Sequence, residues 1–208
     1  MLNEKSLSGK HYRTAALVLC SFVAVMTAPL EKQQLSVGLN FFLGGRYDNL
    51  RMCVATPAGV KGGPIADMQL VLHYGLNNRM ALGMKVPIMR PVLFGLAFKM
   101  VQIEPEFTMQ YRMPVKKRID VVLEPSVGVS FHYGPDYKTA RNDPHPESFF
   151  AAGPMVALLG GIGWHNDSGR YRCVGLKPFY IPLFSRKRTT GTVLGVVAEG
   201  YWDIASIK

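Results

Sequence analysis

Two long stretches of the chain alternate between two kinds of side chain at every second position. The first covers residues 101–113 (VQIEPEFTMQYRM) and the second covers residues 119–133 (IDVVLEPSVGVSFHY). In both, the odd-numbered positions are apolar throughout, and the even-numbered positions are mostly polar or small. A strand places successive side chains on opposite faces, whereas a helix would scatter them around its surface. Both stretches therefore predict β-strands with one continuous apolar face.

The length of these stretches narrows the fold class. They are 13 and 15 residues long, whereas strands of globular proteins have a most common length of about 5–6 residues. A strand that crosses a membrane needs about 9–11 residues and alternates apolar outward with polar inward. A soluble barrel would place the apolar residues inside instead. The pattern therefore favours a transmembrane β-barrel.

The rest of the chain divides into similar segments, because 21 Gly and 14 Pro punctuate it and favour many strands and turns. In the segment that ends at residue 113 the alternation slips at Met100–Val101, which predicts a β-bulge there. An even strand number suits a closed barrel. The sequence predicts an all-β, closed, antiparallel, up-and-down transmembrane barrel of eight strands, at 35–45, 66–76, 79–88, 92–113, 119–133, 148–165, 171–183 and 190–204.

The connections between these segments differ in length on the two sides of the predicted barrel. Membrane barrels have short inner turns and longer outer loops. If the expected inner turn at 114–118 is symmetric about Lys116, Arg112 lies opposite Asp120 on the neighbouring strand. The expected inner turns are 77–78, 114–118 and 166–170, and the expected outer loops are 46–65, 89–91, 134–147 and 184–189.

The N-terminal region has the pattern of an export signal. Lys5, Lys10 and Arg13 precede an apolar run at 15–28, which is too short for a transmembrane helix. We expect a signal peptide at 1–28, a short lead at 29–34 and the barrel at 35–208. A lipoprotein acylated at Cys20 and an uncleaved anchor are the alternatives.

Two local motifs connect the chain to a known class of proteins. The hairpin-like run YGLNNRMALG occupies residues 74–83, and an apolar-Glu-Pro motif occurs at 103–105 and again at 123–125. With these motifs, the chain after residue 34 resembles the small bacterial outer-membrane barrels of the OmpA, OmpX and OmpW type. The resemblance implies export to the outer membrane, and outer-membrane lipid as the surrounding partner.

The predicted inner face carries several charged or titratable residues. An eight-stranded barrel has an interior just wide enough for side chains, and buried charges are costly unless they are paired or hydrated. We interpret them as a closed, ion-paired lumen, with a narrow polar conduit or a small-ligand cavity as the alternative. The residues are His73, Lys85, Glu104, Glu106, Arg112, Asp120 and Glu124.

Three classes of function follow for such a barrel: a structural or surface-exposed role, a channel for small solutes, and a lipid-modifying enzyme such as a lipid A deacylase. For the enzyme, Ser130, His132 and Glu147 are the candidate catalytic residues. Ser130 and His132 share one strand face but lie about 7 Å apart along the strand, which predicts no direct hydrogen bond and no enzyme. A soluble, exported, lipocalin-like binder with its apolar faces turned inward is the alternative fold.

The chain has a net charge of +10. No basic helix that could read nucleic acid accompanies it, so nucleic acid is excluded as a partner. Contact with anionic headgroups or solvent explains the charge best, and acidic surface glycans are the alternative partner. The basic residues of the expected outer loops are Arg46, Arg51, Lys61, Lys138, Arg141, Arg186, Lys187 and Arg188.

The cysteines suggest neither a metal site nor a disulfide. Cys53 falls in an expected outer loop, and Cys173 falls near the inner end of the seventh strand. Their expected separation of roughly 20 Å exceeds the reach of a disulfide. No metal-ligand spacing occurs, so we expect no metal and no cofactor. The sequence leaves the oligomeric state open.

Overall fold

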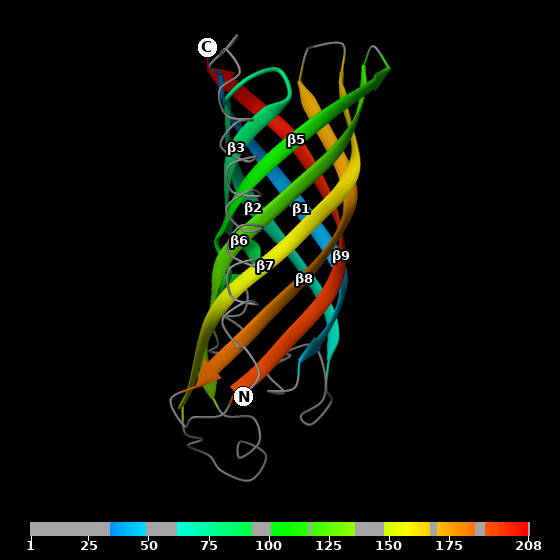
Figure 1. The fold of residues 1–208 in the computed structure, drawn as a ribbon. Helices are drawn as coiled ribbons and strands as arrows, with labels where there is room; N and C mark the ends of the chain where they lie inside the picture. Colours follow the sequence, from blue (N-terminus) through cyan, green and yellow to red (C-terminus); the bar gives the residue numbers. More distant parts are fainter. Residues whose placement is uncertain are drawn as a thin grey trace, which may run out of the picture. The chain divides into compact units, whose positions relative to one another are not determined.

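The strands form one antiparallel sheet that closes into a barrel (Figure 1). The computed structural model describes residues 34–48, 62–92, 101–116, 118–135, 148–166, 170–185 and 190–207, so the predicted signal peptide lies outside the described residues. The strands are β1 (Gln34–Asp48), β2 (Gly63–Gly75), β3 (Met80–Pro87), β4 (Val101–Ile103), β5 (Glu106–Lys116), β6 (Ile119–Pro135), β7 (Ser148–His165), β8 (Tyr171–Ser185) and β9 (Thr190–Ile207).

These strands occupy eight positions around the wall. β4 and β5 both pair with β6, so they follow one another along the same position. β6 also pairs with β7 along its full length, which closes the ring. The predicted closed, antiparallel, eight-stranded barrel is confirmed.

The period-2 pattern directs apolar side chains outward. Phe107 is 64% exposed and Val127 is 59% exposed, whereas Glu106 and Glu124 are each 2% exposed. Buried and more exposed positions alternate in this phase along most of β2 and β6, and along β5 from Glu106 to Tyr111. The predicted face assignment is therefore confirmed for these strands, and the soluble alternative with inward apolar faces is wrong for them.

The interior is not polar all round, which corrects the expectation of a hydrophilic lumen. β8 is apolar on both faces, because Phe179, Ile181 and Leu183 point inward while Tyr180 and Phe184 are exposed. Such a strand shows no polar-apolar alternation, so its inner face cannot be recognised from the pattern. The inward residues belong to an apolar cluster of Phe42, Ile65, Ala151, Met155, Phe179, Ile181, Leu183, Val193 and Val197.

The turn between β5 and β6 differs from the predicted one. Arg112 pairs with Val122 across the strands, and Asp120 pairs with Pro114. The predicted Arg112–Asp120 pair is wrong, because β5 continues to Lys116 and the hairpin closes one residue later than expected. A one-residue change in the centre of a hairpin moves every cross-strand pair by two positions.

The described part of the fourth wall position is interrupted at 104–105, and the predicted bulge at Met100–Val101 falls at the edge of the described residues. β4 ends at Ile103 and β5 begins at Glu106. Pro105 has no backbone N–H to donate to β6 and interrupts the ladder. Its carbonyl still accepts a hydrogen bond from the backbone N–H of Val129 at 3.3 Å. The part of the predicted strand at 93–100 lies outside the described residues.

A helical turn at 89–92 replaces the predicted outer loop at 89–91. It follows the short strand β3, which pairs with β2 and with β5. Arg90 is 2% exposed, because its side chain enters the barrel from this turn. No helix among the described residues is long and apolar enough to cross a membrane.

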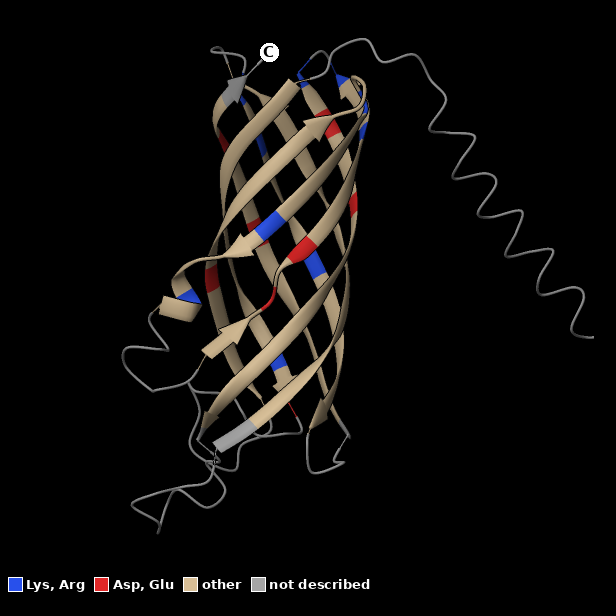
Figure 2. Ribbon diagram, turned by 90° about the vertical axis from the view of Figure 1, so that its left-hand side faces the viewer, with Lys and Arg blue, Asp and Glu red and all other residues tan. Residues whose placement is uncertain are grey.

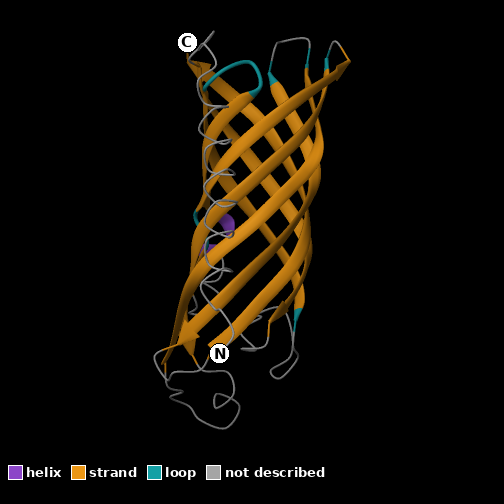
Figure 3. Cartoon of the chain, viewed as in Figure 1, coloured by secondary structure: helices purple, strands orange, loops and turns teal. Residues whose placement is uncertain are grey.

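The two ends of the barrel differ in their connections (Figure 3). At one end, called the short-turn end here, β2 joins β3 at 76–79, β5 joins β6 at 117–118 and β7 joins β8 at 166–170. β1 begins and β9 ends there as well. At the opposite end the connections at 49–62, 136–147 and 186–189 lie almost wholly outside the described residues.

Candidate functional site

The centre of the lumen holds a network of two lysines and three glutamates. The Lys85 ammonium pairs with Glu199 and lies 2.6 Å from Glu124 Oε1. The Lys177 ammonium lies 3.0 Å from Glu106 Oε1 and 2.7 Å from Glu199 Oε2. All five side chains are buried. Each charge thus has an opposite charge beside it, as the cost of burying ions requires.

Neutral side chains extend this network to the neighbouring strands. The Gln69 amide donates to Glu106 Oε1 at 3.2 Å, and the Asn40 amide donates to Gln69 Oε1 at 2.7 Å. The Ser126 hydroxyl donates to Glu106 Oε2 at 2.9 Å. The central network therefore joins side chains from β1, β2, β3, β5, β6, β8 and β9 across the barrel.

A second group of charges lies where the helical turn at 89–92 meets the wall. Arg90 donates through its backbone N–H and Nε to the two oxygens of Asp67, at 2.9 and 3.0 Å. Its Nη2 donates to Glu104 Oε2 at 2.7 Å, and the Gln102 amide donates to Glu104 Oε1 at 2.7 Å. Arg90 thus links Asp67 on β2 to Glu104, which lies between β4 and β5, on the inner side of the wall.

The geometry of Ser130 and His132 corrects the sequence-based prediction. Ser130 Oγ lies 2.8 Å from His132 Nε2, because the two side chains lean toward each other although their backbones are a strand repeat apart. Ser130 Oγ also donates to Glu104 Oε1 at 3.0 Å. Glu147, the third predicted member, lies outside the described residues.

This group does not have the geometry of a catalytic triad. In a triad, the carboxylate holds the histidine nitrogen that faces away from the nucleophile. Here Glu104 Oε1 and Ser130 Oγ both lie near His132 Nε2, at 3.4 and 2.8 Å, and His132 Nδ1 has no hydrogen-bond partner among the described residues. Ser130 and His132 are fully buried. The group therefore packs the lumen and offers no access to a substrate.

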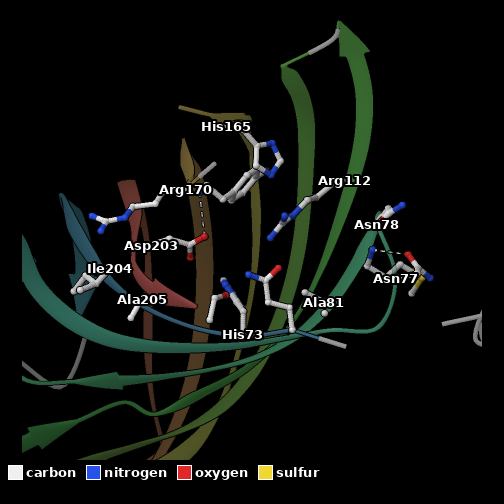
Figure 4. A pocket seen from close by; sticks show the side chains of 15 residues that line it. His73, Asn77, Asn78, Ala81, Arg112, His165, Arg170, Asp203, Ile204 and Ala205 are labelled. Atoms are coloured by element: carbon white, nitrogen blue, oxygen red, sulfur yellow. Dashed lines mark hydrogen bonds between the residues drawn. The ribbon is translucent and has the colours of Figure 1, made fainter. Parts of the chain in front are cut away.

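The short-turn end of the barrel holds a cavity of about 620 Å³. Figure 4 shows Arg112, His73 and Asp203 pointing toward one another from β5, β2 and β9. Beside these side chains the lumen contains a layer of buried residues. This layer consists of Val71, Val122, Leu159, Tyr171, Cys173 and Tyr201.

The structure places the predicted lumen residues at three levels. Glu106, Glu124 and Lys85 belong to the central network, and Glu104 belongs to the Arg90 group. His73 and Arg112 line the cavity at the short-turn end. Asp120 is half-buried near the same end.

The predicted set of outer-loop basic residues is wrong for Arg46. This residue lies inside β1, is 7% exposed and pairs with Asp48 at 3.5 Å. The strand runs three residues further than expected, because Arg46 and Asp48 continue its inward face. The other predicted loop residues, Arg51, Lys61, Lys138, Arg141, Arg186, Lys187 and Arg188, lie outside the described residues.

Besides Arg46 and Asp48, four buried charged residues of the described interior were missing from the predicted lumen set. Asp67, Lys177 and Glu199 lie on inward positions of β2, β8 and β9. Counting alternate positions along β2 would have found Asp67. It would not have found Lys177, because β8 is apolar on both faces. Arg90 has no such signal, because it enters from a helical turn. Cys173 is buried with a free thiol, and no cluster of metal ligands occurs in the described part of the chain.

The chain's sequence matches no protein-family profile and no curated protein sequence. Its fold is similar to that of Neisserial surface protein A, with a TM-score of 0.50 and 9% identity over 82% of this chain and 99% of that one. Two further solved structures are more distant. Ail of Yersinia pestis has a TM-score of 0.43 and 10% identity, over 85% of this chain and 99% of that one. The N-terminal barrel domain of Pseudomonas aeruginosa OprF has 0.41 and 13%, over 81% and 99%.

The similarity to Neisserial surface protein A concerns the fold. It confirms the resemblance to the small outer-membrane barrels that the alternating segments and the hairpin at 74–83 predicted. At 9% identity it carries no information on ligands or activity.

Proposed function

We propose that this chain is an integral outer-membrane barrel with a closed lumen. The barrel conducts no solute, and it presents the connections between its strands on the two sides of the membrane. Three observations support the membrane location: the barrel fold, the length of its strands and the apolar outer face. Outward side chains such as Leu43, Leu176 and Val196 are each at least half exposed. In water such a surface would be an aggregation hazard, whereas lipid would cover it.

The central network is the observation that favours a closed lumen. Lys85 and Lys177 pair with the two carboxylate oxygens of Glu199. Lys85 also pairs with Glu124, and Lys177 also pairs with Glu106. These charged groups are paired with one another, so none of the five is left to replace the water of a hydrated ion. Passage would require several buried ion pairs to separate at the same time, which is costly.

Planar-bilayer recording tests the closed lumen. We expect the refolded protein to insert without discrete current steps in 1 M KCl. Heat-modifiable migration on a gel, in which the unboiled folded barrel runs differently from the boiled chain, serves as the control for folding. Discrete single-channel steps from protein that passes this control would contradict the proposal and favour a channel.

A further inference from the structure

The cavity at the short-turn end has the dimensions of a small-molecule site. Its volume is about 620 Å³, within the range of about 300–1,000 Å³ that ligand pockets occupy. It is lined from β1, β2, β3, β5, β7, β8 and β9 and from the turn at 76–79. The cavity belongs to the barrel itself and does not depend on the connections at the opposite end.

Arg112 is the cation best placed to bind a ligand in this cavity. Its guanidinium carbon lies 3.7 Å from the centre of the Tyr171 ring, and its Nε donates to Gln110 Oε1 at 2.6 Å. These two contacts fix the orientation of the guanidinium plane. Its terminal nitrogens make no hydrogen bond or ion pair with any residue that the structure describes. A guanidinium held in this way presents a fork of donors that matches two oxygens of a carboxylate or phosphate.

Two buried side chains of the cavity have polar atoms without a partner. His73 is 2% exposed and Tyr171 is 1% exposed. The Tyr171 hydroxyl and His73 Nδ1 have no hydrogen-bond partner among the described residues. His73 Nε2 faces Glu124 Oε2 at 3.8 Å, which is too long for a hydrogen bond. Buried polar groups are normally hydrogen-bonded, so these atoms indicate a place where a polar guest would be stabilised.

The only acidic side chain that lines the cavity among the described residues does not neutralise Arg112. Asp203 accepts hydrogen bonds from the backbone N–H of Tyr171, at 3.1 Å, and from the hydroxyl of Tyr201. Its negative charge is thereby held against the wall. The guanidinium of Arg112 keeps its unpaired donors.

The rim around the cavity is basic. Figure 2 shows Lys and Arg positions gathered at this end of the barrel. Clustered charges of one sign at the mouth of a cavity raise the local concentration of the opposite ion. The exposed residues at this rim are Arg79, Lys116, Arg118 and Arg170.

We propose that the short-turn cavity binds the oxyanion group, a carboxylate or a phosphate, of a small soluble molecule, and that the Arg112 guanidinium holds this group above the His73–Tyr171 floor. In the membrane orientation of barrels with short inner turns, this cavity opens toward the periplasm. The site lies next to the central network, because the Gln110 amide that accepts from Arg112 also donates to Glu124 at 2.7 Å. Binding at this site does not rest on the closed lumen, because the cavity opens at the short-turn end.

Titration of the refolded ¹⁵N-labelled protein in a non-ionic detergent tests this proposal. The probes are inorganic phosphate and acetate, each added against sodium chloride at constant ionic strength. The backbone amide signals of Tyr171 and Ala81 report on the cavity. We expect a saturable shift with at least one probe, weakened by roughly tenfold or more in Arg112→Gln, since hydrogen bonds to charged groups are among the stronger ones.

Arg172→Gln is the matched control, because it removes the same charge from an exposed position at the same end. It should leave the binding curve within about twofold of the unaltered protein. If Arg112→Gln fails to fold, Arg112→Lys replaces it and should still weaken binding, because an ammonium lacks the bidentate fork. Shifts that rise without saturation, or equal binding by Arg112→Gln and Arg172→Gln, would overturn the proposal whatever the bilayer recordings show.

Discussion

Replacement of Lys85 by Met is expected to destabilise the barrel by about 3–5 kcal/mol, because it leaves buried carboxylates without their partner. Lys85 contacts both Glu124 and Glu199 at the centre of the lumen. Without it, only the Lys177 ammonium would remain to balance the three glutamates of the central network. Equilibrium unfolding in urea, followed by tryptophan fluorescence in lipid vesicles, measures the effect.

Lys116→Met is the control, because Lys116 is exposed at the end of β5 and its replacement should change stability by less than about 0.5 kcal/mol. The double variant Lys85→Met/Glu124→Gln should recover part of the loss, since it removes one of the unpaired carboxylates. Equal stability of the Lys85 and Lys116 variants would show that the central network does not hold the lumen closed.

Replacement of Phe107 by Lys tests the outer face. Phe107 is 64% exposed on the outside of β5, and the wall position formed by β4 and β5 runs from residue 101 to 116, so Phe107 lies near its middle. A Lys side chain that faces the middle of a bilayer costs about 2–4 kcal/mol. We expect a loss of this size for the protein refolded in phosphocholine vesicles and unfolded in urea.

Val115→Lys supplies the matched comparison. Val115 is 62% exposed on the same strand, close to the turn into β6. Near the membrane surface the cost of a Lys falls to about 0–1 kcal/mol. A similar loss for both variants would mean that no depth gradient acts on the outer face, and would argue against a bilayer around the barrel.

The barrel could be predicted from the sequence because outward apolar residues and inward polar or small residues alternate along its most regular strands. In β6, Val127, Val129 and Phe131 are exposed while Ser126 and Ser130 are buried, and this contrast is what the pattern at 119–133 predicted. The two-residue period and the length of these stretches together indicated membrane-spanning strands. The hairpin register was less certain, because turn length determines it and the side-chain pattern does not distinguish shifts of two residues.

The candidate sites were harder to predict, because they depend on how strands far apart in the sequence face one another. Lys85 and Glu199 are 114 residues apart, and nothing local to either residue indicates the pair. Arg90 enters the lumen from a helical turn that breaks the strand pattern. The short-turn cavity is formed by side chains that were individually unremarkable, such as His165 and Asp203. Only closure of the barrel brings these residues together.

Collision accessibility of spin labels tests the central claim most directly. Single labels would replace Val127, Val129 and Arg118 in a cysteine-free chain refolded into lipid vesicles. Val127 and Val129 are exposed on the outside of β6, and Arg118 is exposed in the short turn before it. The account predicts that labels at 127 and 129 collide with lipid-soluble oxygen and are protected from a water-soluble nickel chelate, with the reverse at 118. Free access of the nickel chelate to 127 and 129 would contradict it.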